Sequence, residues 1–220
     1  MTYGEIAREI AAGIPVSLSV AISGIIIGAM LAIGVVAARI SDNRLVSASA
    51  WLYLQLVRSV PMIALLFVLY YGLSQFQGVR DSVLWPVLRE PIWCAIIALS
   101  LKTSAYVSEV YRTGIAAVPP GEILAARSFG FRGYRLYRSI IIPYAIPVVI
   151  PAFSNEFVIL VKASSLASLI TLMDMTGIAA AIGSETFRPL TAFTVAAIYY
   201  LVFNSLMIGL FGIAERKLTK

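Results

Sequence analysis

The sequence predicts an all-α membrane protein with about five transmembrane helices. Three observations indicate this: 60% of the 220 residues are apolar, only 13% are charged, and long uncharged apolar runs recur along the chain. Soluble domains contain about 45–50% apolar and about 25% charged residues. The apolar excess requires lipid as a solvent, which excludes soluble, disordered, fibrous and nucleic-acid-binding proteins. We expect residues 1–220 to form a single transmembrane domain.

Five segments satisfy the requirement of about 20 mostly apolar residues for one membrane crossing. The first is too long for the apolar core of a secretory signal and is followed by no short cleavage site, so we interpret it as a span. The predicted spans are 13–38, 59–79, 91–111, 140–172 and 189–214.

The fourth of these segments is unusual. Residues 140–172 contain Pro143, Pro147 and Pro151. As one helix the segment would measure about 50 Å, against a hydrocarbon core of about 30 Å. Proline also removes a helical hydrogen bond. We therefore predict a broken span, with the remainder packed against protein or water.

The distribution of basic residues predicts the orientation. The formal net charge is +6, from 17 Lys and Arg against 11 Asp and Glu. With five spans, the N-terminal segment and the two loops on its side carry four Lys and Arg, whereas the segments on the other side carry ten. Because cytoplasmic loops collect Lys and Arg, the N-terminus is expected outside and the C-terminus in the cytoplasm.

Composition also limits the chemistry. The chain has no histidine and a single cysteine, Cys94. This excludes an internal disulfide, histidine acid–base chemistry and an ordinary zinc site, so we predict no catalytic and no metal-binding residues. No G-x-x-x-x-G-K-[ST] phosphate loop occurs, so any ATP must bind to another chain.

The loop at 112–139 predicts a short cytoplasmic helix. Pro119–Pro120 provide its entry, Glu122 suits the positive end of the helix dipole, and Gly130 provides a stop. Ala125–Ala126 would allow a partner surface to approach closely. Such a short helix is marginal alone and needs a brace. The alternative interpretation is a solvated connector whose basic residues set the topology.

Residues 121–143 resemble the cytoplasmic "EAA" loop of ABC-importer permeases. Alanines, Gly130, Ile140 and Pro143 stand at that motif's spacing, with Ile142 in place of its leucine. Further blocks resemble the polar amino-acid branch of the family, which includes histidine, glutamine, arginine and opine permeases; they are 53–61, 99–109, 154–157 and 162–167. The resemblance extends from about residue 13 to 218.

The resemblance implies a multi-pass permease subunit in a bacterial inner membrane. It would import a polar amino acid, a class that includes cationic and opine-type solutes, by alternating access. The implied partners are a pair of ATPase subunits that bind ATP and Mg, a second permease subunit, a periplasmic solute-binding protein and membrane lipid. The chain itself would need no cofactor and would bind no nucleic acid.

The same resemblance assigns the short helix to coupling with the ATPase. The implied coupling residues are Gly121, Glu122, Leu124, Ala125, Ala126, Gly130 and Pro143. Leu124 stands where the motif has glutamate. Glu122 could substitute for it, the ATPase could offer an apolar contact, or a non-identical second permease could carry the coupling. We favour the last explanation, and with it a heterodimer.

Ionisable residues within the predicted spans point to a solute path. A charge in lipid costs about 2.5–3.5 kcal/mol on insertion scales and therefore usually faces a cavity or a partner. Glu109 could be structural, paired with Arg112 one turn later. Glu156 follows the three prolines, and transporters use such broken helices as binding sites.

We therefore predict a solute path lined by Asn155 and Glu156, with Ser104 and Ser108 facing them from the third span. The carboxylate would suit an ammonium group or a cationic side chain. A stand-alone channel or ion-coupled transporter is the main alternative, although no internal repeat supports it. A membrane enzyme would need a Ser–Lys or a paired-carboxylate site; Lys102 with Ser104 or Ser108 could form the first, yet nothing supplies an oxyanion site.

Overall fold

The computed structural model describes residues 1–218, which form helices and turns and contain no strand. This confirms the all-α prediction for the described residues. In chain order the α-helices are α1 (Tyr3–Ala11), α2 (Ile14–Arg39), α3 (Arg44–Ser59), α4 (Met62–Phe67), α5 (Gln77–Arg80), α6 (Trp85–Leu88), α7 (Pro91–Ala116), α8 (Pro120–Ser128), α9 (Gly133–Leu136), α10 (Ile142–Ser164), α11 (Met175–Thr186) and α12 (Pro189–Leu218). Lys220, counted in the charge tally, lies outside the described residues.

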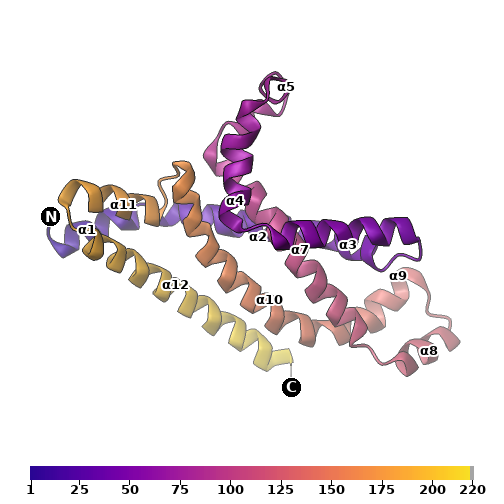
Figure 1. Ribbon diagram of the computed structural model, residues 1–220. Coiled ribbons are helices and arrows are strands. Elements are labelled where there is room, and N and C mark those ends of the chain that lie inside the picture. The colour runs from indigo at the N-terminus through magenta and orange to yellow at the C-terminus, as the bar shows by residue number, and fades with distance from the viewer. Residues whose placement is uncertain (219–220) are drawn as a thin grey trace.

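Helices α2 and α7 pack side by side at the centre of the molecule (Figure 1). A Cβ atom on Gly24 would lie 2.7 Å from the Cβ of Leu99, and one on Gly28 would collide with the Cβ of Thr103. Gly24 meets Leu99, and one turn later Gly28 meets Thr103, so the two helices run parallel. The glycines are required because only a bare backbone allows helices to approach this closely.

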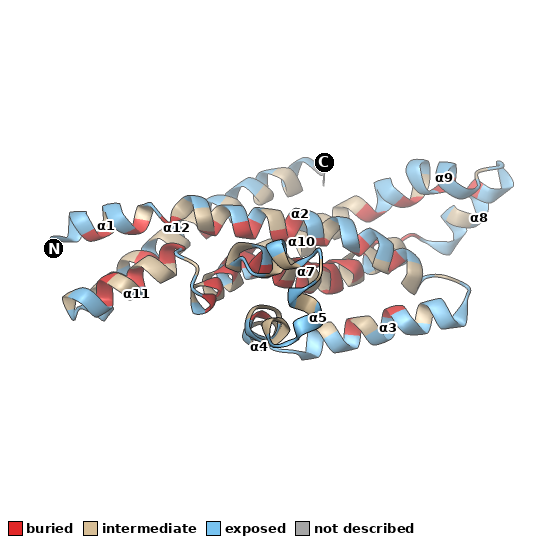
Figure 2. Ribbon diagram, turned by 90° about the horizontal axis from the view of Figure 1, so that it is seen from above, coloured by how far each residue is buried: buried red, intermediate tan, exposed pale blue. Residues whose placement is uncertain are grey.

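Burial separates this centre from the outer helices. In the most apolar 18-residue stretch of α7, 67% is buried inside the protein, whereas only 11% of the corresponding stretch of α12 is buried. Figure 2 shows the same contrast, with buried residues concentrated in α7 and largely exposed faces on α3 and α12. In an apolar chain, these outer faces are available to lipid or to another subunit.

In the described part of the chain, four helical segments are long and apolar enough to cross a membrane: 3–39, 91–116, 133–170 and 189–217. A fifth span exists only if α3 and the segment Met62–Gln75, which meet at 100°, count as one. Residues 1–218 therefore contain four to five candidate spans, in agreement with the prediction of about five. The orientation across the membrane stays a prediction.

The predicted second span, 59–79, is not one continuous helix. The chain bends at Val60 and Pro61, both of which adopt extended ψ angles of 127° and 144°. Proline biases the preceding residue away from the helical region, which explains the bend. Beyond it, α4 continues as a π-helix, Val68–Gly72, and a 3-10 helix, Leu73–Gln75. Figure 1 shows α4 and α5 projecting away from the other helices.

The fourth predicted span, 140–172, shows no break at its prolines. Helix α10 continues through Pro147 and Pro151, and its geometry changes only at its ends, in the π-helix Tyr137–Ile141 and the 3-10 helix Ser165–Ile170. Pro143 directly follows the π-helix, and such a local widening of the helix accommodates a residue that lacks an N–H. Packing against neighbouring helices supports the two internal prolines.

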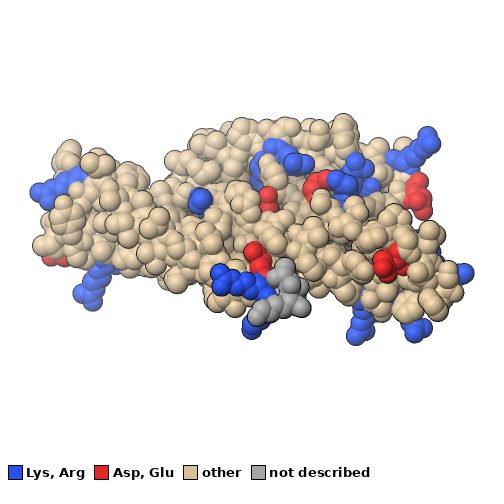
Figure 3. Space-filling model, turned by 90° about the horizontal axis from the view of Figure 1, so that it is seen from below, with Lys and Arg blue, Asp and Glu red and all other residues tan. Residues whose placement is uncertain are grey.

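The short helix predicted in the loop 112–139 is α8. It spans nine residues and is followed by Gly130 at φ +82°, a left-handed conformation that glycine adopts readily. Its brace is a small cluster of buried residues, Val118, Ala126, Leu136 and Ile141. Figure 3 shows more charged side chains toward the end that carries α8 and α9 than over the middle of the molecule.

The opposite end is formed by α1, α11 and the start of α12 (Figure 1). Its polar centre is Asp174, which is completely buried. The Asp174 carboxylate accepts hydrogen bonds from the Gly177 N–H at 2.8 Å and from the Tyr200 hydroxyl at 3.2 Å. The Met175 N–H donates to Ser17 Oγ at 3.1 Å, which ties this end to α2.

Candidate functional site

A polar site lies where α3, α7 and α10 meet. Two cavities of about 360 and 240 Å³ are present, and Arg58, Tyr106 and Glu156 line both of them. Arg58 comes from the end of α3, Tyr106 from the middle of α7 and Glu156 from α10. Three helices that are distant in sequence therefore place a cation, an aromatic ring and a carboxylate around shared space.

Arg58 is held over the ring of Tyr106. The carbon of its guanidinium lies 5.0 Å from the ring centroid, within the range of a cation–π interaction. The Arg58 residue itself is exposed, whereas Glu156 is half-buried. The planar guanidinium thus keeps donors free for an anionic group, while the carboxylate of Glu156 faces the same cavities.

Lys102 determines where α3 ends. Its ammonium donates to the backbone carbonyls of Val57 at 2.6 Å and Arg58 at 3.4 Å, and also to that of Val60. Carbonyls at a helix C-terminus lack helical partners and form the negative end of the dipole, so a buried ammonium stabilises them. Lys102 therefore anchors the bend before Pro61 and the backbone that carries Arg58.

The ion pair considered for Glu109 is present. Glu109 Oε2 accepts from Arg112 Nε at 2.9 Å, one helical turn away. Glu109 also lines the smaller cavity. Its carboxylate therefore combines a structural contact with a position at the edge of the polar site.

The structure does not bring the four predicted path residues together. Glu156 lines both cavities, but its neighbour Asn155 is exposed and lines neither. Ser104 is fully buried, and its hydroxyl lies 2.6 Å from the hydroxyl of Tyr53. Ser108 is buried too and donates to the Ala105 carbonyl at 3.1 Å. The Lys102–Ser104 pair of the enzyme alternative does not form either, since both groups have other partners.

Sequence reasoning missed Arg58 and Tyr106 as members of this site. Tyr106 follows Lys102 by four residues and precedes Glu109 by three, so these polar side chains share one face of α7. That spacing could have identified Tyr106. Arg58 could not have been placed beside Glu156, because its position depends on the bend between α3 and α4.

Most of the implied coupling residues lie on the exposed side of α8. Gly121, Glu122 and Ala125 are exposed, and Leu124 is 64% exposed. Ala126, in contrast, faces the brace. Sequence reasoning missed Phe129, whose side chain is 84% exposed just beyond α8. This end of the molecule thus exposes the apolar side chains of Leu124 and Phe129.

Comparison with known proteins adds independent findings. The family model described as "Binding-protein-dependent transport system inner membrane component" matches residues 24–220. The chain is 46% identical over 204 residues to the octopine transport system permease protein OccM of Rhizobium meliloti, covering 93% of this chain and 83% of OccM. It is 36% identical over 206 residues to the histidine/lysine/arginine/ornithine transport system permease protein HisM of Salmonella typhimurium, covering 93% and 88%.

Solved structures agree. The chain superposes on a chain of an amino acid ABC transporter crystallised with histidines, with a TM-score of 0.86, 28% identity and 99% of both chains covered. The MetNI methionine ABC transporter, in an inward-facing conformation, gives a TM-score of 0.72 at 18% identity, covering 97% of this chain and 94% of the other. The second likeness shows the fold alone.

Proposed function

The chain belongs to the family of binding-protein-dependent transport system inner membrane components, and from this premise we propose that it imports a cationic amino acid or an opine. Its relatives are permease subunits of ABC importers, so the chain is a multi-pass transport subunit and not an enzyme. The relatives' names include octopine, nopaline, histidine, lysine, arginine and ornithine, which supports this choice of solute.

The observation that carries the proposal is the pairing of Arg58 and Glu156 around shared cavities. An amino acid bears a carboxylate and an ammonium group, and a cationic one bears a second positive charge. Arg58 would hold the carboxylate through charge-assisted hydrogen bonds, and Glu156 would hold a positive group. The ring of Tyr106 offers a second attraction for a cation. The larger cavity falls within the size range of small-molecule sites, about 300–1,000 Å³.

The chain would form half of the membrane path and alternate between two openings. It would do so beside a second permease subunit, and we propose that this subunit is a non-identical chain. With the N-terminus outside, α8 would lie in the cytoplasm against an ATPase subunit. Motion of α8 would reach α7 and α10 through the cluster that braces it, because Val118 follows α7 and Ile141 precedes α10.

Leu124, which stands at the position of the motif's glutamate, is exposed, and so is Phe129 nearby. Their exposure supports an apolar contact with the ATPase alongside the non-identical second permease. A solute-binding protein would deliver the solute to the opposite face of the bundle.

The decisive experiment is uptake of radiolabelled arginine, histidine or octopine by the intact importer carrying Glu156→Gln. We expect the apparent affinity for the solute to fall by about 10- to 100-fold, because that is the change in affinity expected when one hydrogen bond to a charged group is lost. Glu9→Gln, an exposed carboxylate on α1, is the matched control. Unchanged uptake by an assembled Glu156→Gln importer would contradict the proposed role of Glu156.

A further inference from the structure

The smaller cavity of the polar site contains a second carboxylate, which the binding of an amino-acid head group by Arg58 and Glu156 does not use. Its volume is about 240 Å³. Besides the three residues that it shares with the larger cavity, Glu109, Thr113 and three aliphatic side chains line it. The larger cavity is lined by Lys102 but by neither Glu109 nor Thr113. The two cavities therefore differ in charge, and the smaller one is the more acidic.

The smaller cavity extends along α7 and α10 away from the shared residues. Tyr106, Glu109 and Thr113 are spaced by three and four residues, so they follow one face of α7. Glu109 lies about 4.5 Å further along the helix axis than Tyr106, because each residue rises about 1.5 Å. On α10, Ala152 lines the cavity one turn before Glu156. A solute held at Glu156 could therefore extend its side chain past Ala152 to Glu109.

Glu109 keeps one carboxylate oxygen available. Its Oε2 accepts a hydrogen bond from Arg112 Nε at 2.9 Å, whereas its Oε1 accepts none from any residue that the structure describes. Arg112 itself lines neither cavity. A carboxylate has about four lone-pair sites, so the ion pair leaves room for a second donor. The pair also holds the Glu109 side chain in one orientation at the cavity wall.

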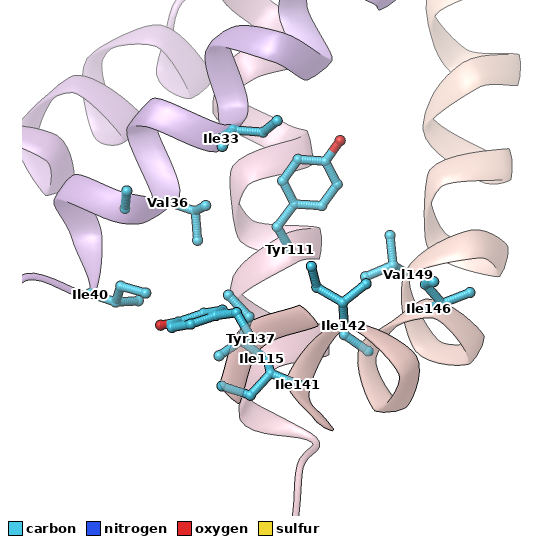
Figure 4. Close-up of a pocket in the computed structure, with 12 residues that line it drawn as sticks. Ile33, Val36, Ile40, Tyr111, Ile115, Tyr137, Ile141, Ile142, Ile146 and Val149 are labelled. Carbon is cyan, nitrogen blue, oxygen red and sulfur yellow. The ribbon is translucent and has the colours of Figure 1, made fainter. Parts of the chain in front are cut away.

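A cavity with an uncharged lining on the same two helices provides a comparison. It has a volume of about 410 Å³ and lies between α2, α7 and the start of α10, where α7 contributes Tyr111 and Ile115 (Figure 4). Ten of its lining side chains are aliphatic and two are tyrosines. A guanidinium there would lose its water without gaining a counter-charge, which is costly. Of these three cavities, only the smaller polar one is lined by two carboxylates among the described residues.

We propose, on the basis of the proposed function, that Glu109 selects solutes that carry a second positive charge at the end of their side chain. Arg58 holds the solute carboxylate and Glu156 holds the α-ammonium group. The apolar part of the solute side chain lies against the aliphatic lining of the smaller cavity. Its terminal guanidinium or ammonium group donates to Glu109 Oε1 and to the Thr113 hydroxyl.

The test is equilibrium binding of radiolabelled arginine to the detergent-purified importer complex, without the solute-binding protein, so that only the membrane site contributes selectivity. Citrulline is the competitor, because it has the shape of arginine but an uncharged end. The wild-type complex should bind arginine about tenfold more tightly than citrulline, which is the effect of one charge-assisted hydrogen bond. Glu109→Gln should remove this preference and change the affinity for citrulline by less than about twofold. Equal affinities for both solutes in the wild type would overturn the proposal.

Arg112→Gln is the matched control, because it breaks the same ion pair but leaves the carboxylate of Glu109 in place. It should keep the preference for arginine. If Arg112→Gln loses the preference as completely as Glu109→Gln does, Glu109 acts only through its ion pair, which would contradict the proposal. Ala152→Leu narrows the smaller cavity without changing a charge, so it should weaken the binding of both solutes by about tenfold. This variant decides the matter if Glu109→Gln does not assemble, and unchanged binding would then refute the use of the cavity.

Glu156→Gln separates selection by Glu109 from the proposed function itself. Arginine and citrulline both carry an α-ammonium group, so the loss of the Glu156 carboxylate should weaken both by the same factor. Unchanged binding of both solutes to Glu156→Gln would contradict the proposed function. If Glu156→Gln weakens both solutes, while Glu109→Gln weakens neither or weakens both equally, only the selective role of Glu109 is refuted.

Discussion

Replacement of Lys102 by methionine is the sharpest test of how the polar site is held. Methionine keeps the length of the side chain but removes the ammonium that serves three carbonyls at the end of α3. Because Lys102 is only 8% exposed, water cannot easily take its place. The variant would leave these carbonyls without their donor while α4 departs at 100°.

The expected cost follows from those contacts. A hydrogen bond to a charged group contributes about 1.5–3 kcal/mol, and the three share one ammonium, so they do not add in full. Removal of the ammonium also removes its desolvation cost, which offsets part of the loss. We therefore expect a destabilisation of about 2–3 kcal/mol, equivalent to roughly 4–12 °C in Tm for a chain of this size.

The assay is thermal unfolding of the assembled importer, followed by solute uptake. Lys162→Met is the matched control: Lys162 is also on a membrane helix, but it is exposed and donates no hydrogen bond to a described residue, so its loss should cost less than about 0.5 kcal/mol. Lys102→Arg, which retains a cation and its donors, should lie between the two. Equal Tm values for Lys102→Met and Lys162→Met would refute the anchoring role.

Three further predictions concern other parts of the chain. Gly28→Ala should destabilise the protein by about 1–3 kcal/mol, because its Cβ would collide with Thr103, whereas Gly34→Ala should not; thermal unfolding compares them. Burial raises the pKa of the Asp174 carboxyl, so its protonated form is favoured in the folded state; wild-type stability should fall relative to Asp174→Asn as pH rises from 3.8 through the raised pKa. Leu124→Glu should change complex stability and coupled ATPase activity by less than about twofold; a tenfold increase would show that the motif charge is needed.

The elements that the sequence predicted well are those with local causes. A long uncharged run determines α2. Prolines at its start and Gly130 after its end determine α8. Both helices can be predicted without reference to the rest of the chain. The two places where the helices differ from the expected ones both involve proline. Pro61 bends the chain because Val60 adopts an extended conformation, while Pro147 lies inside a helix that neighbouring packing supports. The residue type is the same, and only the tertiary surroundings distinguish the outcomes.

The candidate site was predicted only in part. Glu156 could be found because a carboxylate inside an apolar segment is costly and therefore informative. Its partners could not be found this way. Ser104 is polar and on a neighbouring helix, yet its hydroxyl lies against Tyr53 inside the bundle. Arg58 comes from a segment nearly a hundred residues away and reaches Glu156 because Lys102 holds the end of its helix.

The sequence by itself therefore determined that this protein is a helical membrane permease, and where most of its helices lie. Hydropathy, glycine and proline positions, and motif spacing are properties of short stretches of chain, so they can be recognised without a fold. Only the tertiary structure decided which polar groups share a cavity and which are satisfied internally. That choice depends on the side of each helix that its neighbours cover, and the covering helices come from distant parts of the chain.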